Sequence, residues 1–214
     1  TSPAVFPLQG GLVLNKSTFA MQPGEAIELV NFEPDINGGY RRINGFEKYN
    51  TNIVPITSAS TEEVLLSCIF NGTIVAARGT KIFTASAGSG SWTERDTGRT
   101  SAGVYTFERF NFDGNDKLIV ADGNNAPTVF NTSFAATDVS SGGGGEVTTA
   151  VTGAKFVAVF KDHMFYAGMA NNKQEVVFSV PFDEDNFATG SGAGSFKVDD
   201  TITGLKVFRE DLFV

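Results

Sequence analysis

Few residues of this chain have the types and spacing that catalysis needs. His163 is the only histidine among the 214 residues, and it follows the turn-like pair Lys161-Asp162. A hydrolytic triad would depend on that one imidazole, and neither Ser179 nor Cys68 lies in a nucleophile motif such as GxSxG. We therefore interpret His163 as a structural residue and predict that the protein has no catalytic residues and is not an enzyme.

The acidic residues include the best candidate for a cation site. Asp183-Glu184-Asp185 is followed by Asn186, and Asp199-Asp200 comes later in the chain. Calcium prefers oxygen ligands from such loops, but the EF-hand spacing is absent, and an acidic run between strands is usually a solvated loop. The glycine-rich stretches at 140–145 and 188–195 read as loops and lack the GxxxxGK[ST] phosphate-binding pattern. We predict neither a bound metal nor another cofactor.

The overall charge limits the partners of this chain. The formal net charge is −8 with a pI of about 4.7, which argues against a protein that grips nucleic acid by neutralising phosphates. An acidic surface could still line a passage for DNA. The single cysteine, Cys68, permits no internal disulfide and is predicted to be a small buried hydrophobe. No apolar run approaches the roughly 20 residues of a membrane span, so no membrane anchor is expected.

A loosely repeated unit accounts for most of the chain. An apolar run, a two-residue turn and a second apolar run occur around Asn71-Gly72, Asp113-Gly114 and Lys161-Asp162, and the pattern begins again near residue 205. The glycines that close the second run are 44 and 45 residues apart, at Gly79, Gly123 and Gly168. This spacing is the length of a four-stranded β-propeller blade. Equivalent repeats predict exposed turns and buried side chains at Ile74, Leu118 and Phe165.

The repeat predicts an all-β, propeller-like fold with four-stranded antiparallel blades of about 45 residues. We expect an N-terminal arm and first strands over 1–60 and blades over 61–214, at approximately 61–103, 104–150, 151–203 and 204–214. The last range is only the start of a blade, so three and a half units fall short of the four to eight blades of a closed propeller and the ring would be incomplete. The chain is expected to be part of a larger polypeptide or the ordered part of one. An antiparallel sandwich with evenly spaced strands is the alternative.

The first 60 residues contain turns and apolar residues but no clear repeat. Pro23-Gly24 and Gly38-Gly39 are turn signals, and Asn44-Gly45 has the composition of a hairpin turn. Residues 25–32 could form a short helix or a strand, which Pro34 would end. We expect this arm to pack on the propeller or on a neighbouring subunit. Its candidate assembly contacts are Tyr40, Arg41, Arg42 and Phe46.

Several strings of residues resemble a known family. Residues 10–12 (GGL), 23–26 (PGEA), 29–34 (LVNFEP) and 39–46 (GYRRINGF) resemble the start of the tail-hub or nozzle proteins of short-tailed bacteriophages, also called packaged-DNA stabilisation or tail tube proteins. Residues 178–187 (FSVPFDEDNF) and 198–208 (VDDTITGLKVF) are similar to the blade segments of that family.

The resemblance implies a β-propeller subunit of a virion ring below the portal and adaptor, bounding the DNA exit channel. The implied partners are identical subunits, the neck adaptor or portal and other tail proteins, while genomic DNA passes without specific binding. The implied location is the phage tail, after assembly in the bacterial cytoplasm.

Two other functions fit a propeller. One is a general interaction scaffold. The other is a carbohydrate-active enzyme, because residues 86–93 (SAGSGSWT) are similar to the Asp-box turn of sialidases. That turn lacks its aspartate here, and no arginine cluster for a sialic-acid carboxylate is evident. Fold alone would not establish an activity.

Overall fold

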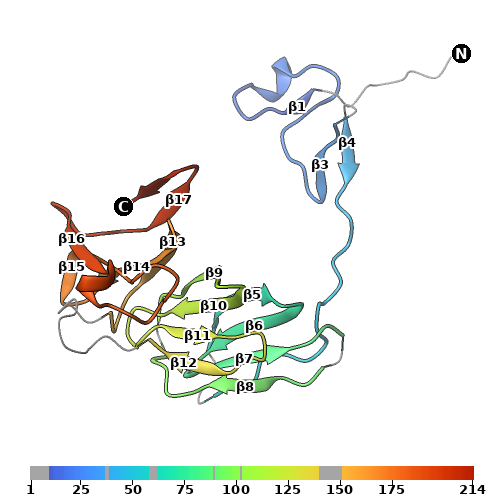
Figure 1. Cartoon of the computed structure of the whole chain (residues 1–214). Helices are drawn as coiled ribbons and strands as arrows, with labels where there is room; N and C mark the ends of the chain where they lie inside the picture. The colour runs from blue at the N-terminus through green and yellow to red at the C-terminus, as the bar shows by residue number, and fades with distance from the viewer. Residues whose placement is uncertain (1–9, 37–38, 58–61, 89, 102, 140–150) are drawn as a thin grey trace, which may run out of the picture. The chain divides into compact units, whose positions relative to one another are not determined.

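The structure is a computed structural model of the chain and describes residues 10–36, 39–57, 62–88, 90–101, 103–139 and 151–214. It contains two compact units, Thr1–Lys48 and Tyr49–Val214, which we describe separately (Figure 1). Residues 49–57, which the sequence analysis grouped with the arm, belong to the second unit. Tyr49 donates a hydrogen bond from its hydroxyl to the Gly72 carbonyl at 2.8 Å, and the Asn50 amide donates to the Ser86 and Gly90 carbonyls.

The N-terminal unit consists of two pairs of very short strands. β1 (Gly11–Leu12) pairs in parallel with β2 (Glu25–Ala26), and β3 (Phe32–Pro34) pairs antiparallel with β4 (Tyr40–Arg42). A single 3-10 turn, η1 (Thr18–Ala20), lies between β1 and β2. The predicted turn at Pro23-Gly24 is confirmed, because Gly24 has a φ of 92° and the Glu25 N–H donates to the Gln22 carbonyl at 3.1 Å.

Two local expectations for this unit are wrong. Residues 25–32 form neither one helix nor one strand, since β2 ends at Ala26 and β3 begins at Phe32. Pro34 is the last residue of β3, where the missing N–H of proline is tolerated. Asn44-Gly45 lies in a stretch without regular structure and is not a hairpin turn. Of the second glycine pair, Gly39 has a φ of 83°, and Gly38 lies outside the described residues.

The second unit contains three four-stranded antiparallel sheets and a hairpin, each with its strands in chain order. The first sheet is β5 (Val64–Phe70), β6 (Thr73–Arg78), β7 (Lys81–Ala85) and β8 (Thr93–Asp96). The second is β9 (Thr106–Phe112), β10 (Asn115–Ala121), β11 (Thr128–Phe130) and β12 (Ala136–Asp138). The third is β13 (Phe156–Phe160), β14 (His163–Met169), β15 (Asn172–Phe178) and β16 (Gly194–Lys197).

The C-terminal hairpin is β17 (Lys206–Phe208) and β18 (Asp211–Phe213). The chain is therefore all-β, as predicted, and its four-stranded sheets are compatible with blades, although the described residues form no closed ring. Of the two predicted glycine-rich loops, residues 140–145 lie outside the described part. The other contains η2 (Thr189–Ser191) and the start of β16. Among the described residues, no helix is long and apolar enough to cross a membrane.

The three repeated turns have the geometry that joins twisted strands. Both central residues have positive φ in each turn: 45° and 69° at Asn71-Gly72, 54° and 78° at Asp113-Gly114, and 47° and 65° at Lys161-Asp162. This combination matches the type I′ turn, whose twist agrees with that of the flanking strands. All six residues are exposed, as the repeat predicted.

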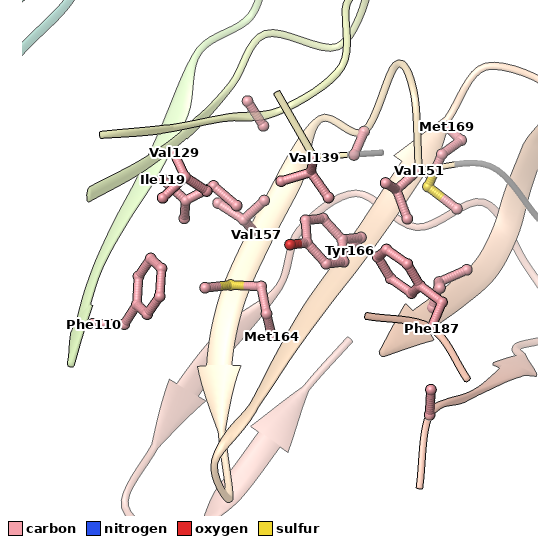
Figure 2. Close-up of a cluster of buried hydrophobic side chains, with 14 of the residues drawn as sticks. Phe110, Ile119, Val129, Val139, Val151, Val157, Met164, Tyr166, Met169 and Phe187 are labelled. Carbon is pink, nitrogen blue, oxygen red and sulfur yellow. The ribbon is translucent and has the colours of Figure 1, made fainter. Parts of the chain in front are cut away.

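Neighbouring sheets stack face to face through alternating side chains. On β10, Leu118 and Val120 pack against the first sheet, whereas Ile119 and Ala121 pack against the third. Figure 2 shows the second of these cores, in which Met164 and Tyr166 of β14 face side chains of the second sheet. On its other face β14 packs with the hairpin through Phe165 and Ala167. The second strands β10 and β14 are thus packed on both faces, the stacking that a repeat architecture requires.

The burial predictions hold at two of the three positions. Leu118 is fully buried and Phe165 is 8% exposed, but Ile74 is only half-buried. Val75 and Ala77 occupy the face of β6 that packs on the second sheet, so the alternation of the strand directs Ile74 to the opposite face.

Candidate functional site: an assembly surface on the N-terminal unit

The β3–β4 hairpin brings together three of the four predicted assembly residues. Tyr40, Arg41 and Arg42 form β4 and lie opposite Pro34, Glu33 and Phe32 of β3. Backbone hydrogen bonds hold both ends of the hairpin, from the Asp35 N–H to the Gly39 carbonyl and from the Ile43 N–H to the Asn31 carbonyl. Because side chains alternate along a strand, Tyr40 and Arg42 lie on one face and Arg41 on the other.

Arg41 is held by an ion pair on the surface. Its Nε donates to Glu33 Oε1 at 2.7 Å, with side chains that are 63% and 43% exposed. Exposed pairs of this kind stabilise a protein by only about 0–1 kcal/mol, so the contact orients Arg41 more than it stabilises the hairpin. The guanidinium has five N–H donors, so most of its hydrogen-bonding capacity remains available to a partner.

Tyr40 connects the hairpin to the turn at Pro23-Gly24. Its hydroxyl lies 3.5 Å from the Gly24 carbonyl, to which it donates. The ring is half-buried and lines a hollow of about 500 Å³ together with residues from β2, β3 and the segment between them: Gly24, Glu25, Ala26, Glu28, Leu29, Val30 and Phe32. At its rim, hydrogen bonds from the Lys16 ammonium and the Gln22 N–H lower the pKa of Glu25.

Phe46, the fourth predicted residue, is not part of the hairpin. It follows β4 in a stretch without strand pairing, and its side chain is 94% exposed. The structure therefore places Tyr40, Arg41 and Arg42 on one strand, with Arg41 on the opposite face from the other two, and Phe46 four residues after Arg42 in the chain.

The described part of the N-terminal unit has no buried core. None of its residues whose burial is described (10–33, 35–36 and 39–48) is buried, whereas nine large apolar side chains are exposed. These are Leu12, Leu14, Phe19, Ile27, Val30, Phe32, Ile36, Ile43 and Phe46. Burying one such side chain is worth about 1.5–3 kcal/mol, and isolated two-stranded ribbons are marginally stable at best. Covering these side chains would therefore stabilise this unit.

Sequence reasoning missed most of these apolar residues. It selected Tyr40 to Arg42 because of the basic pair and left out Phe19 and Ile36, which are fully exposed. The available signal was that the apolar residues of this segment follow neither a strand nor a helix period, so no regular element could turn them toward a common core.

A second hollow, in the unit Tyr49–Val214, was also not predicted from the sequence. It has a volume of about 510 Å³, and its lining includes Glu108 and Arg109 of β9, Phe156 of β13 and Lys206 of β17. Burial raises the pKa of Glu108, while the nearby Lys206 ammonium acts in the opposite direction. The hollow carries charges of both signs, unlike the wholly basic groove that phosphate binding favours.

The residues considered for chemistry have structural contacts. His163 Nδ1 faces the Ser179 carbonyl, and the Ser179 hydroxyl accepts from the Met164 N–H and donates to the Val180 carbonyl. Cys68 packs between the first and second sheets, which confirms its prediction as a small buried residue, and burial raises the pKa of its thiol to about 11.

The acidic segment after Phe182 is engaged in local contacts. Glu184 forms an ion pair with Lys117, and the Asp183 carboxylate accepts hydrogen bonds from Asp185 and Asn186. Asp199 accepts from the Gln174 amide through its carbonyl. Within the described ranges, no three His, Cys, Asp or Glu side chains gather as metal ligands would.

The fold and the exposed hairpin define an all-β protein of stacked four-stranded sheets that carries an apolar N-terminal unit. Comparisons with protein-family models, curated proteins and solved structures found no match.

Proposed function

We propose that this protein is a structural virion protein, a subunit of the tail hub or nozzle ring of a short-tailed bacteriophage. In this role identical subunits form a ring below the portal–adaptor complex in the virion. The ring bounds the DNA exit channel and helps to retain and deliver the genome. The phage assignment comes from the sequence resemblance in residues 10–46 and 178–208.

The observation that carries an assembly role is the exposed apolar surface of the N-terminal unit. Nine large apolar side chains are exposed and none is buried among its described residues. So many exposed apolar side chains in one small unit support a site of protein–protein contact, because single exposed apolar residues are ordinary but large groups of them are not. Arg41 and Arg42 beside it supply the polar groups that such interfaces carry at their rims.

We further propose that the stacked sheets are propeller blades. The third sheet approaches its neighbours at its first strand, since Cα atoms of β13 come within 8 Å of β9 and β10 of the second sheet on one side and of β17 of the hairpin on the other. Sheets that are closest at one edge fan outward from it, as blades do around an axis. A general interaction scaffold has the same body, so the quaternary structure distinguishes the two functions.

Negative-stain electron microscopy of the purified chain, with its mass measured in parallel, tests the proposal. We expect symmetric rings with a wide central pore and a mass that is a multiple of the chain's 22.7 kDa. Single discs of one chain at every concentration would overturn the ring and favour the interaction scaffold.

A further inference from the structure

The chain contains the same dipeptide, Asn-Gly, in two very different described environments. Asn44-Gly45 follows β4, and Asn71-Gly72 forms the turn between β5 and β6. A third copy, Asn37-Gly38, lies outside the described residues. Asparagine followed by glycine is the sequence most prone to spontaneous deamidation, because glycine has no side chain to hinder attack by its own backbone nitrogen.

Asn44-Gly45 is exposed to solvent and has free space around it. All residues from 41 to 48 are exposed, and a side chain placed on Gly45 would meet nothing within 4 Å. The last backbone hydrogen bond of the hairpin is made by the Ile43 N–H. Among the described residues, neither Asn44 nor Gly45 makes a hydrogen bond, so rotation about the Asn44 Cα–C bond breaks no hydrogen bond of this part of the chain.

Asn71-Gly72 is held by two contacts and by its turn conformation. Phe70 and Thr73 pair directly across the turn, both turn residues have positive φ, and the Asn71 amide donates to the Thr132 carbonyl at 3.2 Å. Deamidation requires the glycine nitrogen to swing onto the asparagine side chain. In the turn, that rotation would break the pairing of β5 with β6 and release the Thr132 contact.

We propose that Asn44-Gly45 is a site of spontaneous deamidation in the folded protein and that the hairpin protects Asn71-Gly72. The Gly45 backbone nitrogen loses its proton and attacks Cγ of Asn44, a C–N bond forms, and the side-chain nitrogen leaves as ammonia. Water then opens the succinimide at either carbonyl and gives aspartate or isoaspartate. No oxidant, reductant or co-reactant other than water is consumed. The inference does not depend on the proposed function.

The modification changes the chain between the basic hairpin and Phe46. Each event adds one negative charge close to Arg41 and Arg42, and the isoaspartate form also inserts an extra methylene carbon into the backbone. Both changes fall between Arg42 and Phe46, two of the predicted assembly residues.

Peptide mass spectrometry of the full-length chain tests the inference, because trypsin places the three sites in separate peptides, 17–41, 43–48 and 49–78. The protein is incubated at mildly alkaline pH, both native and in denaturant. In the native protein we expect peptide 43–48 to deamidate at least about tenfold faster than peptide 49–78, the factor expected when a turn must first lose its backbone hydrogen bonds. In denaturant the two rates should become similar.

Two variants control for the chemistry. Gly45→Ala should slow conversion at Asn44 and leave Asn71 unchanged, and Asn44→Gln should abolish the product in peptide 43–48. Chromatography should resolve both aspartate and isoaspartate forms of that peptide. Equal native rates at Asn44 and Asn71, or an intact Asn44 over a period in which the denatured chain converts, would overturn the proposal.

Discussion

At the scale of single residues, Asp122 is a buried negative charge between the first and second sheets. Its side chain is fully buried, and the Arg99 guanidinium lies 3.4 Å away and is itself almost buried. Arg99 also pairs with Asp96 at the end of β8, at 2.6 Å. The backbone N–H groups of Asn124 and Asn125 donate to Asp122 Oδ1. A charge in this position is tolerated only because these groups compensate for its lost hydration.

This arrangement predicts that the protein loses stability at low pH. Burial alone would raise the pKa of Asp122, but hydrogen bonds from Asn125 and Asn124 and the charge of Arg99 outweigh it and lower the pKa below 3.8. A lowered folded-state pKa stabilises the protein above the unfolded value, and this contribution is lost as the pH falls through the folded value. We expect the unfolding free energy to decline below about pH 3.8, and to decline less in Asp122→Asn. Denaturant titrations at several pH values measure both slopes; equal slopes would contradict the assignment to Asp122.

Phe165 provides the most direct test of a core residue. It stacks on Phe178 with ring centroids 5.4 Å apart and packs with Val176 and Ile202. Phe165→Ala should lower the unfolding free energy by about 3–5 kcal/mol, because a large cavity forms. The matched control is Asp162→Gly in the exposed turn that precedes β14. Its φ of 65° suits glycine, so the change should stay within about 1 kcal/mol. Comparable losses in thermal melts of the two variants would count against the stacked core.

At the scale of elements, the sequence predicted the first two strands of each sheet well. Both strands are apolar runs, and the two-residue turn between them requires positive φ, so Asn-Gly and Asp-Gly indicate it directly. The later strands were harder to locate, since β8 and β12 are short and polar at sheet edges, where no core imposes a pattern. In the N-terminal unit, strands of two or three residues leave no periodicity to detect. The apolar residues of that unit, Phe19 and Ile36 among them, follow neither a strand nor a helix period, and this was the one sequence signal of their exposure.

The need for glycine at a closing position of the repeat can be tested at Gly168. Gly168 has a φ of 78°, and a Cβ there would lie 2.9 Å from the Phe156 ring, where β14 passes the start of β13. Gly114 has the same φ but open space around it. Gly114→Ala should cost about 1–2 kcal/mol through backbone strain alone.

Gly168→Ala should cost more than Gly114→Ala, because the Phe156 ring must also move. Denaturant unfolding measures the loss of unfolding free energy in each variant. Because the two glycines have the same φ, the difference between the two losses is the cost of the steric clash with Phe156. Equal costs would show that Phe156 yields freely and that the close approach does not require glycine.

At the scale of the whole molecule, we expect the N-terminal unit to contribute to assembly and the second unit to fold without it. Deleting residues 1–48 removes the exposed apolar unit but keeps Tyr49 and Asn50, which hydrogen-bond to the first sheet. We expect the truncated chain to melt at an unchanged temperature and to assemble only at higher concentration. Sedimentation velocity across a concentration series measures the assembly. A matched variant, Phe46→Ser in the full chain, should weaken assembly in the same direction.

Assembly of the truncated chain at the same concentration as the full chain would show that residues 1–48 are not the contact surface. Loss of the folded signal on truncation would instead show that the body depends on the N-terminal unit.

The net charge of the molecule predicts its affinity for DNA. Affinity for duplex DNA scales with the number of phosphates that basic groups neutralise, and the chain has a net charge of −8. Its only adjacent basic pair is Arg41-Arg42, and Arg41 is already paired with Glu33. We therefore expect no measurable binding to duplex DNA at physiological salt, for the chain alone or assembled, by fluorescence anisotropy. Tight binding that weakens steeply with salt and is lost in Arg41→Gln/Arg42→Gln would identify the hairpin as a DNA clamp and refute passage without contact.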